Sequence, residues 1–230
     1  MVLALPERAR KPLFFAAILG ALTVVVLGIL FAHETVGTAA DVAIRESLQK
    51  LYSPWRQIAL VIDYTAEPVG AVIMFTTLVL VFRKLGHHRA AFLVLAGPGL
   101  AIVITTGLKP LVGRDINNGF LAFPSGHTAT ATAVTLVAML VVVERTKVHV
   151  AWVFVAATAA GLAMAWAQVL LNAHYPTDTL GGYATAFAAV PTAGWVIDRF
   201  MAWRSGSTRT ADPTRSAAPA PLPPDADRTP

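Results

Sequence analysis

The chain has no cysteine, and only 13% of its 230 residues are charged. The first absence excludes disulfide bonds and thiol catalysis. The second sets the chain apart from ordinary soluble domains, in which about a quarter of the residues are charged. The sequence also lacks an internal repeat and a basic stripe with interleaved aromatic residues, so nucleic acid is not expected as a partner. With 56% hydrophobic residues, the composition indicates an integral protein of the membrane bilayer.

Long apolar runs fill most of the sequence. A helix needs about 20 apolar residues to cross the roughly 30 Å hydrocarbon layer of a bilayer. Six runs approach this length and predict an all-α fold, a six-transmembrane-helix bundle. The second run is short and starts with Glu67 and Pro68. The predicted spans are Leu13–Ala32, Glu67–Phe82, Ala90–Leu108, Thr128–Val143, Val150–Leu171 and Leu180–Ile197.

Lysine and arginine are distributed unevenly along the chain. Thirteen of the 18 basic residues fall before the first span, after the sixth, or in the loops that follow the second and fourth spans. Because loops rich in these residues stay in the cytoplasm, both termini are predicted to be cytoplasmic. The loops that follow the odd-numbered spans are then extracytoplasmic, with the protein in the cytoplasmic membrane. This bias also accounts for the net charge of +5.

The chain is predicted to consist of one membrane domain and a tail. Residues 1–203 contain all six spans. Residues 204–230 are rich in proline and alanine and contain almost no large apolar residue, so a disordered cytoplasmic tail is expected.

The first predicted outer loop, residues 33–65, is the longest connection. Within it, apolar residues recur at helical spacing, and Thr38 or Asp41 can cap the helix start. This pattern predicts a helix lying on the membrane surface. Such a helix is either a spacer, which is the favoured interpretation, or a lip beside a substrate site. The apolar residues are Ile44, Leu48, Leu51 and Trp55.

The most informative motif is Pro124-Ser-Gly-His127, in the polar gap before the fourth span. It places the amides of Ser125 and Gly126 at a helix start, where unpaired N–H groups and the helix dipole favour a bound phosphate. A serine helix cap explains Ser125 alone equally well. It does not explain His127, since a histidine at the start of a membrane helix has no packing role.

A second polar cluster follows the fifth span. His174 and Asp178 are four residues apart, so on a helical turn the carboxylate can accept the Nδ1–H of the imidazole. That hydrogen bond selects the tautomer with a free lone pair on Nε2, as a nucleophilic histidine requires. Because both clusters follow odd-numbered spans, they are predicted to meet at one face of the membrane.

Two basic residues lie between the third span and the first cluster. Lys109 ends the span and, taken alone, resembles an interfacial lysine that extends its amine toward water. Arg114 follows Gly113 and is either solvated or a bidentate phosphate ligand.

These residues resemble the type 2 phosphatidic acid phosphatase (PAP2) superfamily, which also includes vanadium-dependent haloperoxidases. Its members carry the motifs Lys-x6-Arg-Pro, Pro-Ser-Gly-His and Ser-Arg-x5-His-x3-Asp. Lys109 begins the first motif, the second is complete, and His174 and Asp178 end the third. Together with the six-span layout, the resemblance covers most of residues 13–200 and implies the PAP2/haloperoxidase-like helical core.

The resemblance implies a mechanism without a metal or other cofactor. His174 would attack the phosphorus and form a phosphohistidine, with Asp178 orienting it. His127 would protonate the leaving alcohol and later activate water. Lys109, Ser125 and the Gly126 amide would hold the phosphate oxygens.

The sequence departs from the motifs at two arginine positions. Ile116 and Asn117 replace the Arg-Pro of the first motif, and Ala167 and Gln168 replace the Ser-Arg of the third. Each lost charge-assisted contact could cost roughly 1.5–3 kcal/mol. Arg114 is expected to compensate as a phosphate ligand, and Gln168 can still donate one neutral hydrogen bond.

The favoured function is therefore hydrolysis of a lipid phosphate or pyrophosphate on the extracytoplasmic face, through a phosphohistidine. An alternative, suggested by the missing arginines, is a catalytically weak relative that binds or translocates a lipid phosphate. A vanadate-dependent haloperoxidase is the third alternative, which the six spans and the reduced anion site disfavour.

Overall fold

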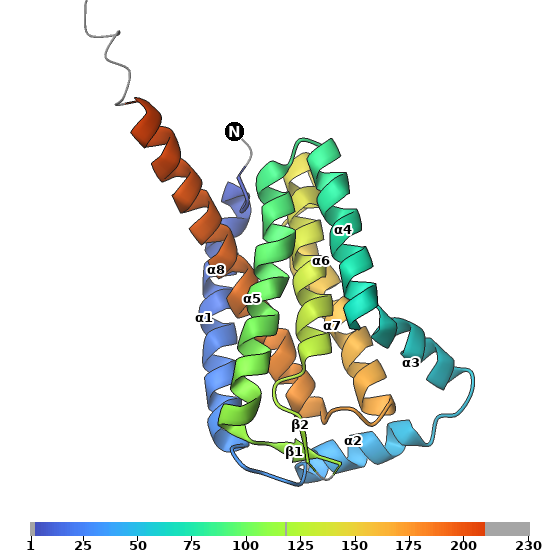
Figure 1. The fold of residues 1–230 in the computed structure, drawn as a ribbon. Helices are drawn as coiled ribbons and strands as arrows, with labels where there is room; N and C mark the ends of the chain where they lie inside the picture. The colour runs from blue at the N-terminus through green and yellow to red at the C-terminus, as the bar shows by residue number, and fades with distance from the viewer. Residues whose placement is uncertain (1–2, 118, 210–230) are drawn as a thin grey trace, which may run out of the picture. The chain divides into compact units, whose positions relative to one another are not determined.

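The computed structural model describes residues 3–117 and 119–209, with only the backbone for residues 205–209. The predicted all-α fold class is confirmed, with one short β-hairpin added to the helices (Figure 1). The helices are α1 (Glu7–Leu30), α2 (Ala39–Gln49), α3 (Trp55–Tyr64), α4 (Pro68–Lys84), α5 (His88–Val112), α6 (Gly126–Arg145), α7 (Ala151–Leu170) and α8 (Pro176–Arg209), and the strands are β1 (Asp115–Ile116) and β2 (Phe120–Leu121).

Within residues 3–117 and 119–209, five helices are long and apolar enough to cross a membrane, namely α1, α5, α6, α7 and α8. They correspond to five of the six predicted spans. The second predicted span corresponds to α4, which has 17 residues and forms a pair with α3 that is bent by 59°. If this bent pair counts as one span, the described residues contain up to six spans, so the protein is a multi-pass membrane protein.

The bend between α3 and α4 follows from local sequence. Pro68 is the first residue of α4, and a proline disfavours helical backbone in the residue before it. Glu67 is accordingly extended, with φ −64° and ψ 154°. The apolar run that begins at Pro68 is therefore a helix separate from α3. Because α4 cannot extend before Pro68, it has only 17 residues.

The helix predicted in the first loop is split in two. α2 ends at Gln49, and Trp55, which the helical spacing assigned to the same helix, begins α3. The predicted cap is present: the Thr38 side chain accepts a hydrogen bond from the Asp41 amide, and the Asp41 carboxylate accepts one from the Thr38 amide. This reciprocal pair is a capping box, which fixes where α2 begins.

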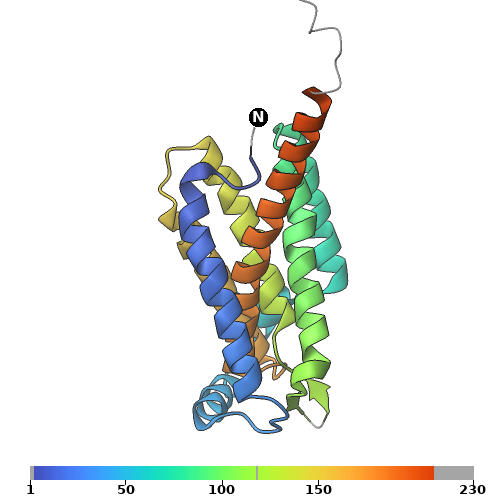
Figure 2. The same cartoon turned by 90° about the vertical axis from the view of Figure 1, so that its left-hand side faces the viewer.

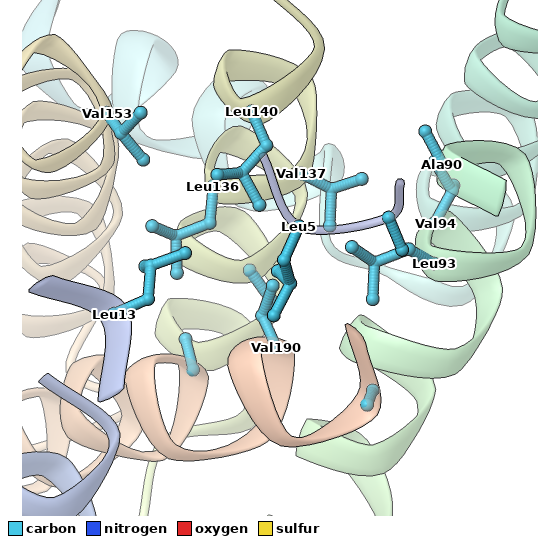
Figure 3. Packing of buried hydrophobic residues seen from close by; sticks show 14 of the residues in the cluster. Leu5, Leu13, Ala90, Leu93, Val94, Leu136, Val137, Leu140, Val153 and Val190 are labelled. Atoms are coloured by element: carbon cyan, nitrogen blue, oxygen red, sulfur yellow. The ribbon is translucent and has the colours of Figure 1, made fainter. Parts of the chain in front are cut away.

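The hydrophobic core is built around α6, of whose 20 residues eleven are buried. The helix packs against α5 on one side and α7 on the other. Figure 3 shows its Leu136, Val137 and Leu140 in one cluster with Leu5, Leu93 of α5 and Val190 of α8. The central position of α6 holds its first turn, where the Pro-Ser-Gly-His motif lies, at a fixed place in the bundle.

α1 runs alongside the first part of α8 (Figure 2). The rings of Phe14 and Trp195 are 5.4 Å apart there. The compact unit that holds the core ends at Asp198, and a second unit begins at Arg199 within α8. Of the predicted tail, residues 204–209 belong to α8, and residues 210–230 lie outside the described part of the chain.

The start of α8 approaches the start of α6 very closely. A Cβ atom on Gly182 would overlap the carbonyl oxygen of Ser125 and lie 3.2 Å from the Ala129 amide nitrogen. Only glycine permits this separation between the two backbones. The contact joins the segment that carries the Pro-Ser-Gly-His motif to the helix that carries Asp178.

Gly182→Ala is therefore predicted to destabilise the protein, even though alanine favours a helix interior over glycine by about 0.5–1 kcal/mol. The overlap with backbone atoms forces the two helices apart, at a cost of about 1–3 kcal/mol. The midpoint of thermal unfolding in detergent, at a fixed heating rate, should fall. Gly99→Ala in α5 is the matched control, because no atom lies within 4 Å of its Cβ position. Equal midpoints for the two variants would contradict the prediction.

Candidate active site

The two histidine-bearing segments lie at the same end of the bundle (Figure 1). α6 and α8 begin at this end, while α5 and α7 finish there. His127 and Lys109 are close enough to His174 for their charges to act on it, as is Asp178. The fold therefore gathers residues from three separate segments of the sequence into one cluster.

The first turn of α6 is fixed by Ser125. Its side chain accepts a hydrogen bond from the Thr128 amide at 3.4 Å, and its own amide donates to the Asp178 carbonyl oxygen at 2.9 Å. Gly126 and His127 are the first two residues of the helix, where amides have no partner within the helix. Ser125 is fully buried and acts as a helix cap, and this cap orients the free amides beside it.

Asp178 closes the start of α8. It is the third residue of the helix, and its Oδ2 accepts the amide of Tyr175, which precedes the helix, at 2.8 Å. Its other oxygen, Oδ1, accepts a hydrogen bond from Nη1 of Arg114 at 2.6 Å. Asp178 has no exposed surface, and both of its oxygens are held.

His174 lies in the loop between α7 and α8, and 6% of its surface is exposed. Its Nδ1 is 3.8 Å from Oδ2 of Asp178, too far for the predicted hydrogen bond. Oδ2 is instead used by the Tyr175 amide. Burial lowers the pKa of His174 below its usual 6.5, Lys109 and His127 act in the same direction, and Asp178 opposes them. The imidazole is therefore neutral at pH 7, the form that a nucleophile requires.

Arg114 is placed differently from its predicted role. Its side chain has 0% exposure and lies between two carboxylates, with Nη1 on Asp178 and Nη2 3.1 Å from Oδ2 of Asp41. The Phe31 and Tyr175 rings lie 4.1 and 5.0 Å from the guanidinium carbon. Because two buried carboxylates share its charge, Arg114 holds Asp178 in place and is not available as a phosphate ligand.

Asp41, on α2, is the residue at this site that the sequence analysis treated only as a helix cap. Besides Arg114, its carboxylate accepts hydrogen bonds from the Thr177 amide at 3.0 Å and the Thr177 hydroxyl at 2.9 Å. Burial would raise the pKa of Asp41, but the hydrogen bonds from Thr177 and Thr38 outweigh it and hold the pKa below 3.8. Asp41 is thus charged throughout the range in which proteins are usually active, and α2 is more than a spacer.

A polar cavity of about 460 Å³ opens at this end of the bundle. Lys109 and His174 both line it. Ile116, which replaces an arginine of the first motif, also lines it and packs against Ala122 and Tyr175. The remaining lining residues are Asn117, Gly119, Phe120, Leu121 and Ala173.

Gln168, at the other missing arginine position, is buried and donates a hydrogen bond from its amide to Asp63 of α3. The same Asp63 oxygen lies 3.5 Å from Nε2 of His127, and a Glu67 oxygen lies 3.4 Å from that atom. Gln168 is therefore bonded to an acidic residue and not directed at the cavity beside His174. The carboxylates face the imidazole proposed from the motif to carry a proton.

Among the described residues, Asp63, Glu67 and His127 have the geometry of a cation site. Ligand atoms of Asp63, Glu67 and His127 lie within 4.8 Å of one another. Two carboxylate oxygens and one imidazole nitrogen suit a divalent cation. No metal was expected from the motifs, which assign His127 to proton transfer.

Sequence reasoning identified the histidines and Asp178 but missed Asp41, Asp63 and Glu67. Asp63 and Glu67 carry a weak signal, because they are four residues apart beside the predicted start of an apolar span. Asp41 was visible as a cap. Its link to Arg114 joins residues 73 positions apart and has no local signature.

Comparison with known proteins finds similarity in sequence and in fold. The sequence model of the PAP2 superfamily matches residues 105–201, which include Lys109, both histidines and Asp178. The fold is similar to a crystal structure of the first transmembrane PAP2 type phosphatidylglycerolphosphate phosphatase from Bacillus subtilis. The TM-score is 0.63 at 18% sequence identity, over 87% of this chain and 100% of that chain. No curated protein matches the sequence.

Arg114→Met is predicted to cost about 3–5 kcal/mol of stability, because it leaves the Asp41 and Asp178 carboxylates buried without their shared cation. The midpoint of thermal unfolding in detergent should fall sharply. Arg56→Met is the control, since Arg56 is exposed on α3 and should change stability by no more than about 0.5 kcal/mol. If both variants unfold at the same temperature, the buried ion pairs do not stabilise this end of the bundle.

Proposed function

Because the chain belongs to the PAP2 superfamily, we propose that it is an integral membrane phosphatase that hydrolyses a lipid phosphate or lipid pyrophosphate through a phosphohistidine on His174. The observation that carries this proposal is the buried His174, which lines the same polar cavity as Lys109. Burial lowers the pKa of this imidazole, which favours its neutral form. A nucleophile and a cation facing one space are what attack on an anionic phosphate requires.

The proposed reaction has two steps. In the first, Nε2 of His174 attacks phosphorus, an N–P bond forms, and the bond from phosphorus to the leaving oxygen breaks as His127 gives that oxygen a proton. In the second, His127 takes a proton from water, whose oxygen attacks the phosphohistidine and frees inorganic phosphate and His174. Lys109 and the amides of Gly126 and His127 stabilise the charge that builds on the phosphate oxygens.

An apolar cavity of about 490 Å³ supports a lipid substrate. It lies between α2, α6, α7 and α8, and its lining includes Thr128, Pro176 and Thr179. Thr128 follows His127 in the chain, and Pro176 lies two residues after His174. An acyl or prenyl chain in this cavity would therefore lie close to a phosphate held at the first turn of α6.

The basic residues support an extracytoplasmic site in the cytoplasmic membrane. At the end of the bundle opposite the site, Arg8 bonds to the carbonyl oxygen of Thr146, and Arg145 bonds to His87. This end also holds the α4–α5 and α6–α7 loops with their lysines and arginines (Figure 1). By the positive-inside rule, that end is cytoplasmic and the site faces outward.

One observation favours the second function, binding or translocation of a lipid phosphate without hydrolysis. Of the basic side chains considered as phosphate ligands, Lys109 lines the polar cavity, whereas Arg114 is held by two carboxylates. Accumulation of a phosphorylated His174 separates the two functions, since a non-hydrolysing protein forms no covalent intermediate.

His174→Ala is predicted to lower phosphate release at least about 1,000-fold, because it removes the nucleophile. The test is a screen of purified protein with phosphatidate, phosphatidylglycerophosphate, polyprenyl pyrophosphate and phosphorylated glycolipid carriers. His88→Ala is the control, since His88 is exposed at the opposite end of the bundle. Wild-type protein that releases phosphate from none of these lipids, or a His174→Ala variant as active as the control, contradicts the proposal.

The pH dependence of activity provides a further prediction. Since the pKa of His174 lies below 6.5, its neutral form prevails above that pH and is lost as the pH falls through the lowered pKa. Log(kcat/KM), corrected for the second ionisation of the substrate phosphate, should therefore turn downward only below pH 6.5. An acidic limb centred above 6.5 is incompatible with a neutral, desolvated nucleophile at this position.

A further inference from the structure

Asp41 closes two helices at once. Its Oδ2 accepts the Thr38 amide at the start of α2, and its Oδ1 accepts the Thr177 amide in the first turn of α8, each at 3.0 Å. The residue before α8 is Tyr175, whose side chain has no oxygen suited to capping the helix. The start of α8 is thus capped by two carboxylates, Asp178 of the same helix on the Tyr175 amide and Asp41 of α2 on the Thr177 amide.

The same carboxylate controls the orientation of Arg114. Nη2 of Arg114 is bound to Asp41, and Nη1 is bound to the Thr177 hydroxyl at 2.7 Å and to Oδ1 of Asp178. With Oδ1 occupied, Asp178 presents Oδ2 to the Tyr175 amide and to His174. Which oxygen of Asp178 faces the imidazole is therefore decided by Arg114, and Arg114 is oriented by Asp41.

We infer that Asp41 is a positioning residue for the candidate active site, acting on His174 through Thr177, Arg114 and Asp178. The inference rests on the proposed function, in which His174 is the nucleophile. Asp41 belongs to α2, outside the residues matched by the PAP2 sequence model. It reaches no cavity, because its side chain is 1% exposed.

The charge of Asp41 is also expected to affect the protonation of His174. The charged or titratable groups that act on His174 are Asp178, Lys109 and His127, with Arg114 directly behind Asp178. Asp41 neutralises part of the Arg114 charge. Without it, more of that charge is felt at Asp178 and His174, and the imidazolium form of His174 is disfavoured further.

The test is Asp41→Asn, with Glu46→Gln as the control that removes one negative charge from an exposed position on the same helix. The substitution replaces one carboxylate oxygen with an NH₂ group. This group would face either the Thr177 amide or the Thr38 and Arg114 donors, so the network cannot keep its geometry. The expected result is a fall in kcat of about 10- to 100-fold with KM within about threefold of wild type, as for a displaced catalytic group. A kcat within about twofold of the Glu46→Gln variant overturns the inference.

A second measurement needs no turnover. Diethyl pyrocarbonate modifies neutral imidazole, and His174 lines a cavity that such a reagent can enter. The rate at which His174 is modified, followed by mass spectrometry, should have its pH midpoint shifted to lower pH in Asp41→Asn and unchanged in Glu46→Gln. A fall in kcat without this shift indicates only general destabilisation and also overturns the inference.

The two measurements separate this inference from the proposed function. If wild-type protein releases no phosphate from any lipid but the midpoint still shifts, the proposed function fails and the coupling of Asp41 to His174 stands. If Asp41→Asn does not fold, Thr177→Val replaces it. This variant removes the hydroxyl that joins Arg114 to Asp41 and is expected to show the same effects, whereas Thr177→Ser retains the hydroxyl and serves as its control.

Discussion

One arginine between two buried carboxylates is the interaction on which this end of the molecule depends. Removing charged groups from water is costly, and one cation cannot neutralise two anions. The remaining negative charge is met by backbone and hydroxyl donors from Thr38, Thr177 and Tyr175. Each oxygen of the Asp41 and Asp178 carboxylates thus accepts a hydrogen bond, and the orientation of Asp178 follows from that requirement.

The second feature of the site is that three helices begin there. α2, α6 and α8 all begin at the site end, and each is closed by a specific oxygen: Asp41 for two of them and Ser125 for the third. The positive ends of the helix dipoles therefore gather where an anionic substrate is proposed to bind. Because Lys109 lines the polar cavity and Arg114 does not, these backbone charges carry a larger share of anion stabilisation than in a site with additional arginines.

The sequence was sufficient to predict features that depend on local pattern. Apolar runs gave the spanning helices, and the spacing of His174 and Asp178 gave one side of the site. Contacts between residues distant in the sequence could not be predicted. Arg114 bonds to Asp178, 64 positions away, and Gln168 bonds to Asp63, 105 positions away. Whether a buried arginine faces a phosphate or a carboxylate depends on which helices meet, and no single-chain motif encodes that choice.

The buried arginine also has a consequence for the order of assembly. Its two carboxylates come from segments that precede the second spanning helix and begin the last one, and the arginine itself follows α5. During synthesis, Asp41 and Arg114 are made long before Asp178. Until α8 enters the membrane, Arg114 lacks one of its carboxylates, and Asp41 caps only the start of its own helix, α2. Insertion of the final helix is therefore the step that completes the site: a chain truncated before residue 176 would retain most of its spanning helices and both histidines but would lack Asp178.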